Sequence, residues 1–326
     1  MPSGSNTLKP VSPAGLLDRS APARGEDSML VLQRNARTLC TLCHRFNIEP
    51  STAILERVAS IYDRRPSWVT AESHPTDLLI LYLAARGLRP QRVVEIGVAS
   101  GLSTCGLLAG LADAGVPAKN PQDGRETVQS FDILEHVPWD ENRPIGAAIA
   151  EVLPELAAGA RINTFRTSLD LERELGDVPV DLAFIDGAHN HPWPLIDAIQ
   201  LSKVMDPNGW IILHDVALVE RAMLEAHLRR MTKLPFTPSR GAEWHFEMWP
   251  SEKLRGSESG HNVALVRPLP LETLRMHPNL QALVALPWES APPEAAQSIL
   301  VEFCGSEAVE RGKILGRPGQ ALLPSS

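Results

Sequence analysis

The sequence contains few of the features that mark specialised classes of protein. Its four cysteines are irregularly spaced, which argues against a disulfide framework and favours a reducing compartment. No apolar run approaches the length of a membrane span, and the first residues lack the apolar region of a signal peptide. We therefore expect a cytoplasmic protein that makes no membrane contact.

Basic residues are also scarce. The 31 lysines and arginines are outnumbered by 39 aspartates and glutamates, which gives a formal net charge of −8. Because no basic cluster interrupts this balance, a nucleic-acid substrate is disfavoured. Hydrophobic residues make up 44% of the 326 positions, which is ample for the core of a globular enzyme.

Proline, serine and glycine divide the chain into segments. The first residues are rich in all three and are predicted to be disordered. Apolar residues then recur at helical spacing to about Ile61, with a break near Pro50. The last part holds several prolines and one predicted helix near residues 294–303, and the sequence assigns it no role. We predict a tail, an N-terminal helical segment, a core domain and a C-terminal extension at residues 1–27, 28–66, 67–270 and 271–326.

The most informative segment is Arg92–Thr104. Its apolar run around Glu95 is typical of a parallel strand that is covered on both faces. Gly97 and Gly101 then permit a sharp turn and a close approach of the backbone to a ligand. Ser103 lies where a helix begins, and the free N–H groups of a helix start can hold a polar ligand. We therefore predict a strand, a binding loop and a helix, as in nucleotide-binding α/β sheets.

The spacing within this loop narrows the choice of ligand. A dinucleotide-binding loop has the pattern G-x-G-x-x-G, whereas Ala99 and Leu102 occupy its second and third glycine positions here. The Lys-Ser/Thr ending of a phosphate-binding P-loop is also missing. The segment instead has an acidic residue followed by Gly-x-x-x-Gly.

Further strands are predicted in order, within residues 128–133, 160–168, 180–189 and 209–216. The first ends in Asp132, at about the distance downstream where an acidic side chain binds ribose hydroxyls. The second presents Ser168, for which a helix cap and an adenine contact are both open. The third delivers Asp186, and the last delivers His214 and Asp215.

These motifs, read together, resemble a known family. The loop described above, the FIDGAH motif of 184–189 and the PNGWIILHDV motif of 207–216 are similar to class I S-adenosylmethionine-dependent methyltransferases. Within that class they are similar to the bacterial small-molecule group related to catechol-type O-methyltransferases, over about residues 70–266. The resemblance implies an α/β fold with a Rossmann-like doubly wound sheet, mostly parallel with a C-terminal antiparallel strand, plus N-terminal helices. We expect residues 241–249 and 260–266 to form the final antiparallel pair.

The resemblance also implies S-adenosylmethionine as cofactor and a hydroxyl oxygen of a small molecule as methyl acceptor. The expected cofactor-binding residues are Glu95, Gly97, Ala99, Ser100, Gly101, Ser103, Asp132, Ser168 and Asp186. The segment His74-Pro75-Thr76 lies over the methionine end of the ligand or is simply a helix start capped by Thr76. In this family the N-terminal helices cover the active site or form a dimer contact, which leaves a homodimer open.

Catalysis is expected where the fourth and fifth strands end. In the catechol-type family a divalent metal such as magnesium is held there by an aspartate and by an Asp-Asn pair. Asp186 and Asp215 match the aspartates, whereas Val216 stands at the asparagine position and leaves the metal shell incomplete. His189 stands where the family has its catalytic lysine, and an imidazole can act as a base near neutral pH. His214 is a second catalytic candidate, and either histidine could instead complete the metal shell.

One motif has a simpler explanation than its pattern suggests. Cys40-x-x-Cys43-His44 matches covalent haem attachment, but that requires export, and a zinc site would need a second Cys/His pair. We predict instead that both cysteines pack on the buried side of a helix.

Two other hypotheses stay open at this stage. One is a related fold recruited for another reaction such as hydroxylation, because a fold does not determine its chemistry. The other is a non-catalytic S-adenosylmethionine-binding protein. Aromatic walls would suit a planar or sugar-like acceptor, and tryptophan side chains pack in the core just as often. The residues for which both alternatives are open are Trp193, Trp210, Trp244, His245 and Trp249.

Overall fold

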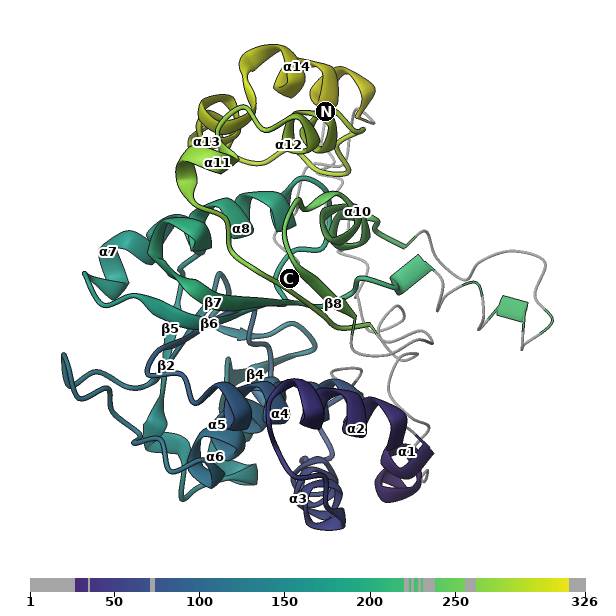
Figure 1. Cartoon of the computed structure of the whole chain (residues 1–326), viewed down its shortest axis with the longest axis vertical. Helices are drawn as coiled ribbons and strands as arrows, with labels where there is room; N and C mark the ends of the chain where they lie inside the picture. Colours follow the sequence, from purple (N-terminus) through teal and green to yellow (C-terminus); the bar gives the residue numbers. More distant parts are fainter. Residues whose placement is uncertain are drawn as a thin grey trace, which may run out of the picture.

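A seven-stranded sheet forms the centre of the protein (Figure 1). This computed structural model describes residues 27–34, 36–70, 74–219, 223, 226–227, 230, 238–255 and 262–316. The strand order is β5-β2-β1-β6-β7-β9-β8. The strands are β1 Val93–Ile96, β2 Val128–Asp132, β5 Ala160–Thr164, β6 Val180–Ile185, β7 Met205–Leu213, β8 Lys253–Arg255 and β9 Ala264–Val266. All pairs from β5 to β7 are parallel, and β9 runs antiparallel to both β7 and β8. The predicted Rossmann-like α/β fold is confirmed.

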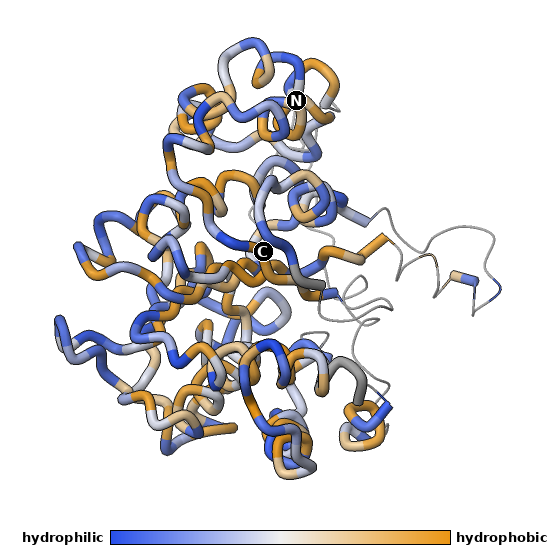
Figure 2. Tube along the Cα trace, viewed as in Figure 1, coloured by the Kyte–Doolittle hydropathy of each residue, from blue (hydrophilic) through white to orange (hydrophobic). Residues whose placement is uncertain are grey.

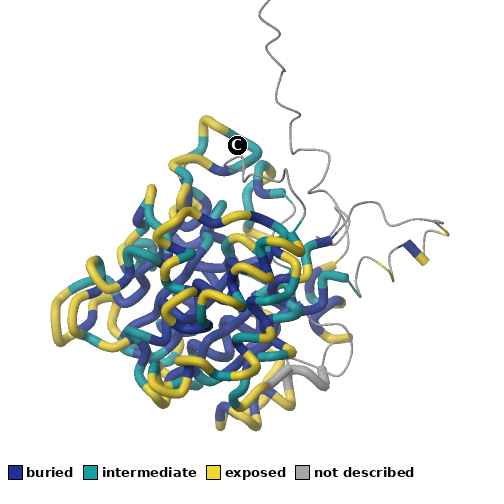
Figure 3. The backbone as a smooth tube through the Cα atoms, turned by 90° about the horizontal axis from the view of Figure 1, so that it is seen from above, coloured by how far each residue is buried: buried dark blue, intermediate teal, exposed yellow. Residues whose placement is uncertain are grey.

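Helices cover both faces of the sheet. Successive strand residues point to opposite faces, so Val93 packs with α4 (Pro75–Leu88) and α5 (Leu102–Asp113), whereas Val94 packs with α8 (Trp193–Val204). The central strands β1 and β6 are mostly apolar because both faces are covered, and each contains one acidic residue, Glu95 and Asp181 (Figure 2). Figure 3 shows the resulting buried centre, surrounded by exposed loops and helix faces.

The N-terminal helices lie on the α4 side of the sheet. They are α1 Ser28–Arg34, α2 Ala36–Arg45 and α3 Thr52–Asp63, and the break near Pro50 is confirmed. Cys43 is buried, but Cys40 is exposed, so the prediction that both are buried is wrong for Cys40. The reason is that the stripe of α2 facing the core is centred on Leu42 and Cys43.

The predicted strand at residues 241–249 is wrong. This segment forms the helix α10 (Gly241–Met248), and the antiparallel partner of β9 is β8. Ala242, His245 and Phe246 are buried, at the i, i+3 and i+4 spacing that belongs to a helix. Their apolar character therefore reflects one helix face rather than an alternating strand.

The C-terminal extension is helical and packs on the core. Its helices are α11 Leu271–Leu274, α12 Pro278–Val284, α13 Glu294–Cys304 and α14 Ser306–Leu315. The helix predicted near 294–303 is thereby confirmed. Leu280, Leu300 and Phe303 belong to the same apolar cluster as α8, so the extension lies outside α8 and α10 (Figure 1). Among the described helices, none has the length and apolarity to cross a membrane. The predicted tail lies outside the described residues except Asp27, and the four segment boundaries stay predictions.

Smaller elements complete the connections between the strands. They are the hairpin of β3 His136–Val137 with β4 Asp140–Pro144, the helices α6 Ala147–Val152 and α7 Leu171–Leu175, and the short 3-10 turns at Ala157–Gly159 and Ser168–Asp170. The hairpin and the turn at Ser168–Asp170 follow the carboxyl ends of β2 and β5 and lie near the predicted site, whereas the turn at Ala157–Gly159 directly precedes β5 at the opposite edge.

Candidate active site

The glycine loop touches the end of β6 directly. The Asp186 N–H donates to the Ile96 carbonyl at 2.8 Å. Gly97 has a φ of 84°, and a Cβ at this position would lie 2.1 Å from the Asp186 carbonyl oxygen. Only glycine fits both the left-handed backbone and this contact. The glycine loop is therefore in direct backbone contact with the segment after β6, which carries the predicted catalytic residues.

Glu95 supports the loop from within the protein. Its side chain is fully buried and accepts hydrogen bonds from Ser103 Oγ (2.6 Å), Thr104 Oγ1 (2.7 Å) and Ser130 Oγ (2.7 Å). Burial raises the pKa of Glu95 to about 7, although the three hydroxyls act in the opposite direction. The carboxyl group thus ties the start of α5 to β1 and β2. Direct contact of Glu95 or Ser103 with a cofactor stays a prediction.

Asp132 holds the outer side of the same loop. Its Oδ2 accepts from the N–H groups of Val98 (2.9 Å) and Ala99 (3.2 Å), and its Oδ1 accepts from the Leu134 N–H (2.9 Å). Each carboxylate oxygen can accept two hydrogen bonds, so Oδ1 keeps a free position. Asp132 lies at the end of β2, where the sequence placed a ribose-binding carboxylate.

The rest of the loop is partly covered by the start of α6. The Ala148 N–H donates to the Ser100 carbonyl (3.0 Å), and the Gly146 N–H donates to the Ala99 carbonyl (2.9 Å). Ser100 and Gly101 are buried, whereas Gly97 and Ala99 are partly exposed. Of the predicted loop residues, Gly97 and Ala99 are therefore the ones that face a ligand most openly.

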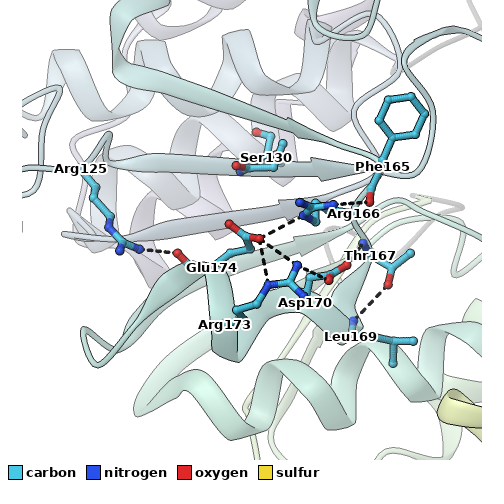
Figure 4. A network of polar contacts seen from close by, with 10 residues as sticks. Arg125, Ser130, Phe165, Arg166, Thr167, Leu169, Asp170, Arg173 and Glu174 are labelled. Atoms are coloured by element: carbon cyan, nitrogen blue, oxygen red, sulfur yellow. Dashed lines mark hydrogen bonds and ion pairs between the residues drawn. The ribbon is translucent and has the colours of Figure 1, made fainter.

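The segment after β5 is fixed by ion pairs. Figure 4 shows Glu174 between Arg166 (3.0 Å) and Arg173 (3.0 Å), and Arg173 also reaches Asp170 (2.6 Å). Phe165 precedes this network with 61% of its surface exposed. The aromatic ring of Phe165 is thus exposed to solvent at the carboxyl end of β5, beside this polar network.

Ser168 is not the helix cap. Thr167 fills that role, since its side chain accepts from the Leu169 N–H at 3.2 Å (Figure 4). Ser168 instead donates to Oδ1 of Asp197 in α8 at 2.6 Å, inside the protein. Burial raises the pKa of Asp197 to about 7, and the hydrogen bond from Ser168 opposes this shift. An adenine contact by Ser168 stays a prediction.

Four predicted residues meet beyond β6 and β7. His189 Nε2 lies 3.6 Å from Asp186 Oδ1 and 3.2 Å from Asp215 Oδ2. His214 Nδ1 lies 2.8 Å from Asp186 Oδ1 and 3.3 Å from Asp215 Oδ1. Burial opposes the charged form of His214, but the nearby carboxylates outweigh it and hold its pKa well above the ordinary value.

Two further residues belong to this cluster and were missed from the sequence. Asp77, in the first turn of α4, lies 3.5 Å from His214 Nε2. Asn262, just before β9, donates from Nδ2 to Asp215 Oδ1. No spacing rule links either residue to the strand-end motifs, because only the folded sheet brings them there. Val216, at the asparagine position of the family pattern, is buried.

Asp77 also shapes the entry to α4. Its Oδ2 accepts from the His74 N–H at 2.9 Å, and His74 Nδ1 accepts from the Thr76 N–H at 3.3 Å. His74 is therefore the N-cap of α4, and the prediction that Thr76 caps this helix is wrong. A histidine cap is uncommon, which is why the hydroxyl was preferred.

The donor set of the cluster fits a divalent metal ion. Asp186, His189 and His214 each offer one ligand atom, and these atoms lie within 4.8 Å of one another. Asp77 faces the outer nitrogen of His214, as carboxylates commonly do when they orient a metal-binding histidine. Mixed imidazole and carboxylate donors suit first-row transition ions as well as magnesium. Asn262 would stand in for the missing asparagine by holding Asp215.

Most of the aromatic residues expected around the acceptor lie in the core. Trp210, His245 and Trp249 have 3%, 1% and 0% of their surface exposed, so the alternative that they line the acceptor site is wrong. Trp210 stacks beneath Arg267, and Trp249 donates to the Arg267 carbonyl at 2.9 Å. Their large apolar surfaces stabilise the packing of β7 and α10.

The comparison with protein families agrees with this geometry. A family described as a methyltransferase domain matches residues 94–216, from β1 to the residue after Asp215. This span contains the glycine loop, Asp132 and the four clustered residues. A search of the curated proteins gives no match.

Solved structures with a similar chain path include three methyl-transfer proteins or cofactor complexes. Cofactor-bound Rv0187 from MTB is 18% identical, with 68% of this chain and 91% of that chain covered and a TM-score of 0.42. The O-methyltransferase TomG from Streptomyces achromogenes, in complex with SAM, is 20% identical, with coverages of 68% and 91% and a TM-score of 0.39. The O-methyltransferase from Bacillus cereus, in complex with SAH, is 18% identical, with coverages of 67% and 92% and a TM-score of 0.41.

Proposed function

We propose, from the methyltransferase domain at residues 94–216, that this protein transfers the methyl group of S-adenosylmethionine to a hydroxyl oxygen of a small molecule. One observation carries the proposal. The glycine loop and the cluster around His189 share the backbone contact between Gly97 and Asp186, so a cofactor on the loop would present its sulfonium beside the cluster. A methyl donor and a base would thus lie at one edge of the sheet.

The cofactor would be held by the partly exposed side of the loop. Gly97 and Ala99 offer backbone at close range, and Asp132 offers its free acceptor position to the ribose hydroxyls. Glu95 would act through the loop, because its carboxyl group is fully buried and accepts from three hydroxyls inside the protein. Ser100, Gly101 and Ser103 would likewise shape the loop from inside, together with Ser168 at the adenine end.

Methyl transfer from a sulfonium is a direct displacement, so the protein must align the acceptor and take its proton. Neutral His189 would keep its Nε2 proton toward Asp215 and accept the acceptor's proton at Nδ1, while the acceptor oxygen bonds to the methyl carbon and S-adenosylhomocysteine leaves. Asp186 and Asp215 would orient the imidazole and stabilise its charged form. His214, held charged by the same aspartates, would balance their negative charge. In the alternative arrangement, a divalent ion held by these aspartates and the neutral histidines would take the place of the charged His214 and would supply charge stabilisation for the acceptor oxygen.

A small acceptor is preferred to a nucleic acid on grounds of charge. The net charge of −8 and the absence of a basic cluster in the sequence disfavour a polyanion. Cytoplasmic location and a homodimer formed through the N-terminal helices stay predictions from the sequence.

Calorimetry and product analysis together test the proposal. The purified protein should bind S-adenosylmethionine and ignore NAD, and it should release S-adenosylhomocysteine when catechols, phenols or sugars are supplied. Binding without product for any acceptor would indicate a non-catalytic protein. Tight NAD binding with no response to S-adenosylmethionine would overturn the whole assignment.

A further inference from the structure

The C-terminal extension reaches into the loop that carries His189. Glu289, which follows α12, accepts hydrogen bonds at Oε2 from the His191 N–H (2.7 Å) and at Oε1 from the Arg240 N–H (2.9 Å). Its own N–H donates to the His191 carbonyl at 2.9 Å. Glu289 therefore binds both polar backbone groups of His191. Its side chain accepts from the His191 N–H, and its own N–H donates to the His191 carbonyl.

A second link runs to His189 itself. Ser239 Oγ lies 2.6 Å from the His189 carbonyl oxygen and 2.7 Å from Glu289 Oε2, so its single proton is available to either acceptor. Ser239 immediately precedes the start of α10. The hydroxyl thus joins the catalytic loop, the start of α10 and the extension at one point.

The start of α10 blocks movement of the loop on one side. A Cβ on Gly241 would lie 2.3 Å from the His189 carbonyl oxygen and 2.5 Å from the His191 nitrogen. The backbone of the loop therefore lies directly against α10. The ring of His191 is buried and packs edge-on against Trp244, with 5.6 Å between the ring centroids. The loop is held by its side chain as well as by its backbone.

We propose that Glu289 is a positioning residue for His189, and that the C-terminal extension serves to set the geometry of the catalytic loop. The inference rests on the proposed methyl transfer for its effect on turnover, but not for its effect on the loop. A carboxylate suits this position because all three partners of its oxygens are donors, and a carboxylate only accepts. The imidazole of His189 must lie within hydrogen-bond reach of the acceptor, and small displacements of catalytic groups are costly.

The variant Glu289→Gln tests this with little change in volume. The amide nitrogen of the glutamine is itself a donor, and it would face the N–H of either His191 or Arg240. One of these two hydrogen bonds is therefore lost. We expect turnover to fall by about 10- to 100-fold with unchanged affinity for S-adenosylmethionine. The His189 ring resonance should shift in NMR spectra, and the His191 amide should exchange faster with solvent.

The matched control is Glu302→Gln, in the same extension, where Glu302 pairs with Arg275 at the surface. Ser239→Ala should move the same His189 resonance by a smaller amount.

The readouts separate the two proposals. Unchanged turnover together with an unmoved His189 resonance in folded Glu289→Gln would overturn the positioning role. A fall in thermal stability with the resonance unmoved would do the same, because Glu289 would then only hold the extension in place. If the wild type binds S-adenosylmethionine but forms no product, the proposed function fails. In that case the His189 resonance and the His191 exchange rate still decide the role of Glu289.

Discussion

His214 Nε2 lies 3.5 Å from Asp77 Oδ2, while Nδ1 of the same ring lies 2.8 Å from Asp186. The ring therefore spans from the first turn of α4 to the end of β6. Because Asp77 Oδ2 also accepts from the His74 N–H, one carboxylate both caps a helix and faces the catalytic cluster. Any change at Asp77 should therefore be felt at His214.

The variant Asp77→Asn removes the charge but keeps an acceptor for His74. We expect the pKa of His214 to fall, because one of the carboxylates that stabilise its charged form is lost. Turnover should fall by about 10- to 100-fold, as for other carboxylates behind a site histidine. NMR titration of His214 measures the first effect and steady-state kinetics the second. The exposed Asp63→Asn in α3 is the control, and a His214 pKa equal to the wild-type value would contradict the assignment.

The order of elements in the core was predictable because buried parallel strands have a strong sequence signal. The mostly apolar runs that end at Ile96 and Ile185 left little choice of strand position. The segment 241–249 was not predictable in the same way. Short apolar runs fit a strand and a buried helix equally well, and tertiary packing on α8 decided for the helix.

The site was predictable only where its residues end strands. Asp186 and Asp215 were found because the carboxyl ends of neighbouring parallel strands meet at one edge. Asp77, Asn262 and Glu289 come from a helix start, the segment just before β9 and the extension, and only the three-dimensional fold brings them to the cluster or its loop. Even for Glu95 the sequence showed the position but not that three hydroxyls donate hydrogen bonds to its side chain.

The variant Asp132→Ala should weaken binding of S-adenosylmethionine. It removes the acceptor of the Val98 and Ala99 N–H groups and the proposed ribose contact. Losing hydrogen bonds to a charged group typically costs about 1.5–3 kcal/mol, which corresponds to a Kd higher by at least about tenfold. Isothermal calorimetry measures this, with Asp140→Ala in the β4 hairpin as control. An unchanged Kd would remove Asp132 from the cofactor site.

Asp197 should make the stability of the fold depend on pH. Burial raises its pKa from 3.8 to about 7, so between these values the folded protein keeps a proton that the unfolded chain has lost. Its contribution to stability is therefore complete below about pH 4 and is lost as the pH rises to about 7. Asp197→Asn keeps an acceptor for Ser168 without this charge. Its free energy of unfolding, relative to wild type, should rise by a few kcal/mol from pH 4 to pH 8, at about 1.4 kcal/mol per pKa unit.

Urea unfolding at pH 4, 6 and 8 measures the effect of Asp197→Asn. The control Asp177→Asn changes an exposed aspartate and should show the wild-type pH dependence. Parallel stability curves for wild type and Asp197→Asn would mean that Asp197 titrates normally.

The metal interpretation of the cluster predicts chelator sensitivity. Protein treated with EDTA should lose turnover and regain it with manganese or magnesium, and calorimetry should detect binding of a divalent ion. Asp186→Asn and Asp215→Asn should lose this binding because each removes a carboxylate ligand, whereas the exposed Glu135→Gln should keep it. If EDTA has no effect and no ion binds, the two aspartates act through His189 and His214 without a metal.

His189 carries the prediction for the chemical step itself. It lies 3.2 Å from Asp215 and 3.6 Å from Asp186, and its side chain remains partly exposed where an acceptor would approach. A general base contributes about a hundredfold or more to rate. His189→Ala should therefore lower turnover by at least about that factor while leaving the Kd for S-adenosylmethionine unchanged. His189→Lys should retain some activity at higher pH, because a lysine must first lose its proton. The exposed His44→Ala in α2 is the control. Turnover of His189→Ala at the wild-type rate would move the role of base to His214.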